Sequence, residues 1–188
     1  MQRNARRRKG GSVLKFAIRN PRSAGARGQA AVEIALALPV LILLLFGAYQ
    51  VGRVLYIYHT LQKSLRGGMQ YVLRAQGVNF CDPNDPVLLD ARNFIVFGNL
   101  QGTGSPVVTG LTVDMIQFLP ERGDPTSTVI TDCGCAGDNS CDISNGGRPP
   151  DYVTVTLGSG FPVQFNFPLV NSGTWTLRVS VRQPFLGG

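Results

Sequence analysis

One long apolar run dominates the hydrophobic pattern of the first third of the chain. Residues 34–52 read IALALPVLILLLFGAYQVG, without a single charged side chain. As an α-helix this run extends about 28 Å, at about 1.5 Å per residue, which matches the hydrocarbon thickness of a bilayer. Pro39 is expected to kink the helix, which membrane helices tolerate better than soluble ones do. The run predicts a transmembrane helix, because the alternative, a buried core helix, rarely lacks polar residues over so many turns.

Apolar residues keep a helical period beyond this run, at intervals of three and four. The apolar positions are Leu55, Tyr58, Leu61, Leu65, Met69, Val72 and Leu73, and the opposite side carries Arg53, Lys63, Arg66, Gln70 and Arg74. This pattern predicts one long helix whose outer half is amphipathic and packs on the rest of the chain or on neighbouring helices. Gly67-Gly68 is expected to be a weak point of this helix, since each glycine costs about 1 kcal/mol relative to alanine.

From residue 79 the pattern becomes shorter in period and richer in turn residues. A short helix is predicted between Asp85-Pro86 and Phe97-Gly98, with proline at its start and glycine as its stop. Strands are predicted at residues 110–119, 126–132, 151–157 and 174–182, and residues 161–167 form either a further strand or an apolar loop. The expected fold class is therefore α+β, with a long N-terminal helix followed by a small antiparallel β-sheet domain with one short helix.

Charge is divided sharply between the two sides of the apolar run. Residues 1–28 contain nine basic side chains and no acidic one, whereas the other 160 residues contain nine basic and eleven acidic ones. The formal charge of +7 therefore belongs to the N-terminal segment, which favours a membrane partner over nucleic acid. The positive-inside rule places the N-terminus in the cytoplasm and exports the chain beyond about residue 53. Tyr49, Tyr56 and Tyr58 then lie near the outer membrane boundary, which aromatic side chains favour.

This apolar run is expected to stay in the mature protein. It is longer than the core of an ordinary secretory signal peptide, and no small-x-small cleavage site follows it. A different signal precedes it, because Glu33 stands at the entrance to the helix, five residues after Gly28. A charge at the entrance to a membrane helix is costly unless it finds a partner, so a functional role is the first hypothesis.

The segment RGQAAVEIALA at residues 27–37 is similar to a type IV prepilin cleavage site, in which a prepilin peptidase cuts after glycine. The resemblance implies a cut after Gly28, Gln29 as the new N-terminus, and Glu33 as the fifth mature residue. Gly28 is expected to supply an extended, open peptide bond. The cut leaves a positive amino group that Glu33 of the same or a neighbouring subunit can pair with, and a carboxylate in the first turn suits the helix dipole. The alternative is that Glu33 is an ordinary helix carboxylate and Gly28 part of a linker.

Further elements extend this similarity over about residues 27–75. They are Val32-Glu33-Ile34-Ala35, Leu38-Pro39, Phe46-Gly47, Gly52-Arg53 and Tyr56. In combination they resemble the opening of TadE-like proteins of the tight-adherence (Tad, or Flp) pilus system. Ile34 stands where the major Flp-type subunit usually has tyrosine, which favours a minor pilin, or pseudopilin. The resemblance implies an inner-membrane protein that works by assembly and whose partners are a prepilin peptidase, other pilins and the lipid bilayer.

Four cysteines lie on the C-terminal side of the apolar run: Cys81, Cys133, Cys135 and Cys141. An even count on the exported side indicates disulfide bonds. Because Cys133 and Cys135 would close a strained ring, two pairings remain: Cys81–Cys133 with Cys135–Cys141, or Cys81–Cys135 with Cys133–Cys141. The spacing does not fit a zinc finger, and the nearby acidic residues do not follow a calcium-loop pattern, so no metal is expected.

No catalytic or cofactor-binding motif stands out. The single histidine, His59, is expected on the helix surface or at the interface, and no phosphate-binding loop occurs. No cofactor, small-molecule substrate or enzymatic activity is therefore expected. The predicted organisation is a basic leader (1–28), a transmembrane helix (29–53), its amphipathic extension (54–77) and an exported β-rich domain (78–188). The alternatives are an uncleaved, membrane-tethered periplasmic binding module and a tethered periplasmic hydrolase.

Overall fold

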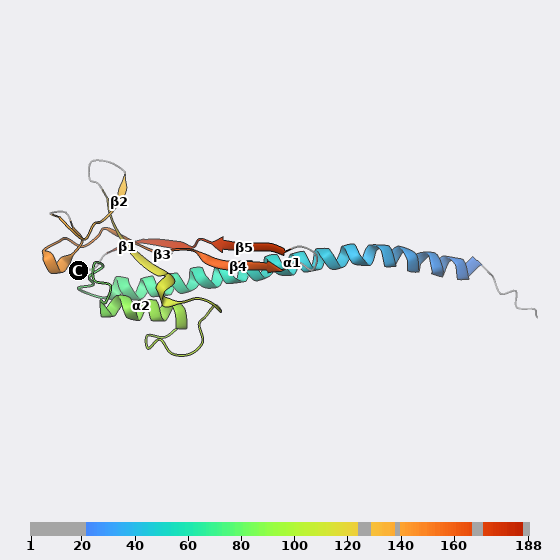
Figure 1. Ribbon diagram of the computed structural model, residues 1–188, viewed down its shortest axis with the longest axis horizontal. Helices are drawn as coiled ribbons and strands as arrows, with labels where there is room; N and C mark the ends of the chain where they lie inside the picture. The colour runs from blue at the N-terminus through green and yellow to red at the C-terminus, as the bar shows by residue number, and fades with distance from the viewer. Residues whose placement is uncertain (1–21, 124–128, 138–139, 167–170, 186–188) are drawn as a thin grey trace, which may run out of the picture. The chain divides into compact units, whose positions relative to one another are not determined.

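The computed structural model describes residues 22–123, 129–137, 140–166 and 171–185, with side chains from residue 28 on except at 166, 171 and 172. It consists of helices α1 (Arg22–Arg74) and α2 (Pro86–Phe97), the 3₁₀ turns η1 (Val113–Met115) and η2 (Ile143–Asn145), and strands β1 (Ile116–Gly123), β2 (Ile130–Asp132), β3 (Tyr152–Leu157), β4 (Phe161–Asn166), β5 (Asn171–Leu177) and β6 (Ser180–Pro184) (Figure 1). This arrangement confirms the α+β class. The chain divides into two compact units, residues 1–45 and 46–188.

In the first unit, α1 continues through Pro39, and the apolar side chains around it are exposed. The large exposed ones are Val32, Ile34, Leu36, Leu38, Val40, Leu41, Ile42, Leu43, Leu44 and Leu45. Gly28–Arg74 contains a stretch long and apolar enough to cross a membrane, and none of that stretch is buried inside the protein. A core helix would be covered by the rest of the protein, whereas this exposed apolar helix could be a single membrane span.

The core of the second unit lies between the outer half of α1, α2 and the larger sheet. Leu61, Leu65, Met69 and Val72 of α1 are buried, as are Ala91 and Ile95 of α2 and Ile116, Phe118, Val153 and Val155 of the sheet. The predicted amphipathic face is therefore confirmed from residue 61 on. Leu55, nearer the apolar run, is exposed instead.

Both ends of α2 were predictable because each is fixed by local chemistry. The Asp85 carboxylate accepts hydrogen bonds from the backbone N–H groups of Val87 (2.9 Å) and Leu88 (3.3 Å), and Pro86 occupies the first turn. Gly98 has a φ of 74° and donates its N–H to the carbonyl of Phe94. A glycine in the left-handed conformation is a common way for an α-helix to end. The predicted boundaries of this helix are confirmed.

Gly67 and Gly68, predicted as a weak point of α1, lie where residues of α2 pack against it. A Cβ atom added at Gly67 would lie 2.8 Å from Cε1 of Phe94. One added at Gly68 would lie 2.6 Å from Cδ1 of Ile95 and 3.2 Å from the Ala91 carbonyl oxygen. The hydroxyl of Ser64, one turn earlier, donates to the carbonyl oxygen of Ile95. Glycine is thus needed for close helix packing here.

Replacing Gly68 with alanine is expected to lower the free energy of unfolding by about 1–3 kcal/mol, the usual cost of overpacking a core. This happens although alanine favours a helix by about 1 kcal/mol over glycine. Gly52→Ala is the matched control, since nothing lies within 4 Å of a Cβ added at Gly52 of the same helix. Urea unfolding of the detergent-solubilised chain measures both. Equal stability of the two variants would show that the close packing is not required.

Two antiparallel sheets follow α2. The larger has the strand order β2-β1-β3-β6, and the smaller is the β4–β5 hairpin. The single strand predicted at residues 174–182 is wrong, because residues 171–177 pair with β4 and residues 180–184 pair with β3. Its alternating pattern runs through both segments, and alternation does not identify the partner strand. The strand predicted from residue 110 begins only at Ile116, after the turn Val113–Met115, whereas residues 161–166 do form a strand.

Candidate processing segment and disulfide-bonded loop

Gly28 lies inside α1, six residues after the helix begins, and is exposed. The extended conformation predicted for it is therefore wrong for the intact chain. Gly28 is not among the glycines with positive φ, and a Cβ atom added there would have nothing within 4 Å. Neither backbone conformation nor packing requires glycine at this position. A protease that binds an extended chain must unwind the start of α1, and glycine, a poor helix former, lowers that cost.

Glu33 follows Gln29 by four residues on the same exposed side of α1. Residues at this spacing are neighbours, about 6 Å apart along the helix axis. Glu33 forms no ion pair with any side chain that the structure describes. Its charge is thus available to a partner outside the described chain, at the point where the apolar surface begins.

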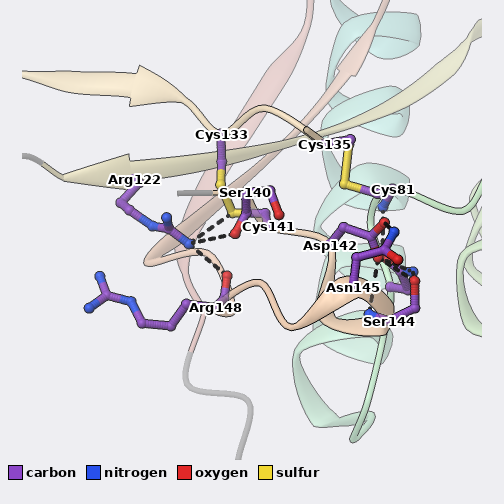
Figure 2. The surroundings of a disulfide bond; sticks show 11 residues. Cys81, Arg122, Cys133, Cys135, Ser140, Cys141, Asp142, Ser144, Asn145 and Arg148 are labelled. Atoms are coloured by element: carbon purple, nitrogen blue, oxygen red, sulfur yellow. Dashed lines mark hydrogen bonds between the residues drawn. A yellow bond between two sulfur atoms is a disulfide. The ribbon is translucent and has the colours of Figure 1, made fainter. Parts of the chain in front are cut away.

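Cys81 is bonded to Cys135 and Cys133 to Cys141, with Cα–Cα distances of 5.5 and 5.7 Å (Figure 2). This is the second of the two pairings that the sequence left open. The first bond ties the loop after β2 to the segment between α1 and α2, 54 residues earlier. The second closes a short ring within the loop. The two bonds together fasten a segment with little secondary structure to the helical part of the second unit.

Arg122 of β1 holds the same loop from the sheet side, a role that no sequence pattern predicted. Its side chain is buried, and its Nη2 donates to the carbonyl oxygen of Arg148 (2.6 Å). It also lies 3.3 Å from Sγ of Cys141 and 3.5 Å from the Ser140 carbonyl oxygen (Figure 2). The Arg122 guanidinium thus contacts backbone carbonyl oxygens on both sides of η2. It supplies hydrogen-bond donors to carbonyl groups that would otherwise be buried without them.

Asp142, at the start of η2, joins the loop to the residues before α2. Its carboxylate accepts hydrogen bonds from the backbone N–H of Ser144 (3.0 Å), from Nδ2 of Asn145 (2.6 Å) and from Nδ2 of Asn79 (3.0 Å) (Figure 2). Asn79 is two residues before Cys81, so a hydrogen bond and a disulfide connect the same two segments. No group of three or more metal-binding side chains occurs among the described residues. Two polar residues of the cysteine loop, Asp138 and Asn139, lie outside the described residues.

Hydrogen bonds, first of all from Ser144, hold the pKa of Asp142 below its ordinary value. A carboxylate with a lowered pKa stabilises the fold above its unfolded pKa, and this contribution is lost as the pH falls through the folded one. Asp142→Asn is therefore expected to be less stable than the wild type at pH 7 but to lose less stability on going to pH 3. Urea unfolding at both pH values measures the difference. An unchanged acid dependence in the variant would contradict the assignment.

His59 lies exposed on α1, with its ring edge-to-face against Tyr58 at a centroid distance of 5.8 Å. This position confirms the predicted surface location. A groove of about 500 Å³ lies nearby in the second unit, lined by Tyr49, Arg53, Tyr56, Ile57, Val107, Val108, Thr109, Phe161, Pro162, Val163 and Gln164. None of these described lining residues carries a carboxylate or an imidazole.

Comparison with known proteins bears on the N-terminal segment. Residues 28–69 match the family model described as TadE-like protein. No match was found among curated proteins or among solved structures. The family match begins at Gly28 and ends within α1, and it confirms the resemblance over residues 28–69.

Proposed function

We propose that this TadE-like protein is a minor pilin, or pseudopilin, of a Tad pilus system, held in the bacterial inner membrane by α1 and cleaved after Gly28 by a prepilin peptidase. The observation that carries the proposal is Gly28 itself, for which the fold gives no reason. It precedes Glu33 and the part of α1 that is apolar on all sides, and the family match begins at this residue. The length of the chain made with and without the peptidase tests the cut.

Membrane anchoring is supported by the exposed apolar side chains of residues 32–45, because exposing this much apolar surface to water costs free energy. The nine basic residues of the leader favour a cytoplasmic N-terminus, and the two disulfides fit an exported second unit. A protease added to spheroplasts is therefore expected to digest the chain beyond residue 53 and to spare the span. Protection of the cysteine loop would contradict this orientation.

The protein is proposed to act through contacts rather than through a reaction. After cleavage, the amino group of Gln29 and the carboxylate of Glu33 lie one helical turn apart, so each can pair within one subunit or across two. A low-dielectric membrane boundary strengthens such a pair relative to water. Other pilins or pseudopilins are the partners that this arrangement fits, with the exported domain as a second contact surface.

Glu33→Gln keeps the size of the side chain and removes only its charge. It is expected to leave cleavage and membrane insertion unchanged, because neither the glycine nor the apolar run is altered. Loss of an ion pair worth about 1.4 kcal/mol weakens subunit association roughly tenfold, so pilus number per cell, counted by electron microscopy, is expected to fall. Glu33→Asp, which retains the charge, is the control and should retain part of the assembly. A normal number of pili in the glutamine variant would show that the charge of Glu33 is not needed for assembly.

A further inference from the structure

The β4–β5 hairpin forms a sheet of its own within the second unit. Its strands pair with each other, with Val163 opposite Trp175 and Phe161 opposite Leu177. The Trp175 side chain is 62% exposed, and its ring lies edge-to-face against Phe165 at a centroid distance of 5.8 Å. Phe161 and Val163 of the hairpin pack on the core of the second unit, whereas Trp175 leaves a large apolar ring exposed on its surface.

Charge is missing from the whole of this hairpin. Residues 152–177 contain no aspartate, glutamate, lysine or arginine, and Arg178 is the first charged residue after them. Exposed edge strands of soluble proteins usually carry charges, especially lysine, which prevent pairing with other chains. A charge-free exposed hairpin is therefore expected to be covered by something other than water.

The hairpin lies beside the part of α1 where the apolar run ends (Figure 1). Phe161, Pro162 and Val163 of β4 line the same groove as Tyr49 and Arg53 of α1. Arg53 is the first charged residue after the charge-free stretch 34–52, so it marks the outer limit of the hydrocarbon. Tyr49 and Tyr56 on either side of it are 67% and 72% exposed.

We propose that the β4–β5 hairpin rests on the outer face of the bilayer, with Trp175 among the phospholipid headgroups. This inference rests on the membrane anchoring proposed above. Tryptophan and tyrosine favour the headgroup region, where the ring is shielded and the polar atom stays hydrated. Among the described strands β4 and β5 pair only with each other, and hydrocarbon could not satisfy the backbone groups along the outer edges of such a two-stranded sheet, so the hairpin is placed outside it. Trp175, Tyr49 and Tyr56 thus form one aromatic belt, contributed by two segments far apart in the sequence.

Trp175 is the only tryptophan of the chain, so intrinsic fluorescence reports on it alone. The full chain is reconstituted in phosphatidylcholine vesicles whose acyl chains carry bromine either near the headgroup or near the bilayer centre. The shallow bromine is expected to quench Trp175 clearly more strongly than the deep one. The control, Trp175→Phe with Gln76→Trp, moves the tryptophan to an exposed position past the end of α1, about 31 Å beyond Arg53 along the helix. Neither lipid should quench it.

Flotation of the same vesicles on a density gradient measures anchoring separately. A chain that floats but shows no more quenching than the control overturns the inference and leaves the proposed anchoring intact. A chain that does not float overturns both. A third outcome is Trp175 emission that neither bromine quenches but that shifts to shorter wavelength as the protein-to-lipid ratio rises. It would show that a second copy of the chain covers the hairpin, and it also overturns the inference.

Discussion

Gly28→Val is expected to leave the chain uncut at its full 188 residues in cells that contain a prepilin peptidase. Nothing in the fold opposes a side chain at this position, because a Cβ atom there has no neighbour within 4 Å. The variant should therefore fold and insert normally, and the loss should come only from the peptidase, whose site must accept the residue before the scissile bond. Valine is chosen over alanine because it strengthens the helix that the peptidase has to unwind less than alanine does.

Gly25→Val is the matched control, since it places the same side chain one turn earlier in the same helix. It is expected to be cut like the wild type. Immunoblotting of membrane fractions separates the uncut chain from the product, which is shorter by 28 residues. If both variants were cut at the wild-type rate, Gly28 would have no role in recognition. If both resisted, the effect would belong to the helix rather than to the cleavage site.

Loss of the Cys81–Cys135 bond is expected to have the largest effect on stability. It spans 54 residues, so its removal frees a long loop in the unfolded chain and lowers the free energy of unfolding by about 4 kcal/mol. The Cys133–Cys141 bond spans only 8 residues, and the same entropy argument gives about 2.5 kcal/mol. Cys135 is exposed and Cys81 partly so, which makes the double serine variant Cys81→Ser with Cys135→Ser a test of the crosslink rather than of packing.

Urea unfolding under non-reducing conditions compares this variant with Cys133→Ala and Cys141→Ala combined. Both cysteines of the short ring are buried, so their replacement adds some loss of packing to the entropy term. The long-range variant should nevertheless be the less stable of the two. A difference in the opposite direction would mean that Arg122 and the Asp142 hydrogen bonds, rather than the long-range disulfide, hold the loop in place.

Features fixed by neighbouring residues were predictable from the sequence. The boundaries of α2 follow from Asp85, Pro86 and Gly98, and the buried face of α1 follows from its helical period. Strand partners were not predictable in this way, because residues 171–177 and 180–184 continue one alternating pattern while pairing with different strands. The close packing of α2 on Gly68 was also missed, since a glycine pair looks the same whether it weakens a helix or admits a neighbour.

In the candidate site, too, features set by neighbouring residues were predictable and features set by distant partners were not. Gly28, Gln29 and Glu33 could be proposed because the resemblance of residues 27–37 to a prepilin cleavage site is local in the sequence. The disulfide pairing stayed open, since both alternatives avoid the strained ring. In the folded chain, Asp142 accepts a hydrogen bond from Asn79, and Arg122 contacts Cys141. These contacts hold the loop in the position in which Cys81 bonds to Cys135 and Cys133 to Cys141. Arg122 had no local signature, because its partners are backbone carbonyls about 20 residues away or more.

Cleavage after Gly28 is tested by the mass of the intact membrane-bound chain, measured after coexpression with and without a prepilin peptidase. Without the peptidase the chain is expected at its full length. With the peptidase we expect a product of 160 residues that begins at Gln29 and still floats with membranes, since 28 of the 188 residues are removed. An unchanged mass in the presence of an active peptidase, or a new N-terminus at any other residue, would contradict this cleavage.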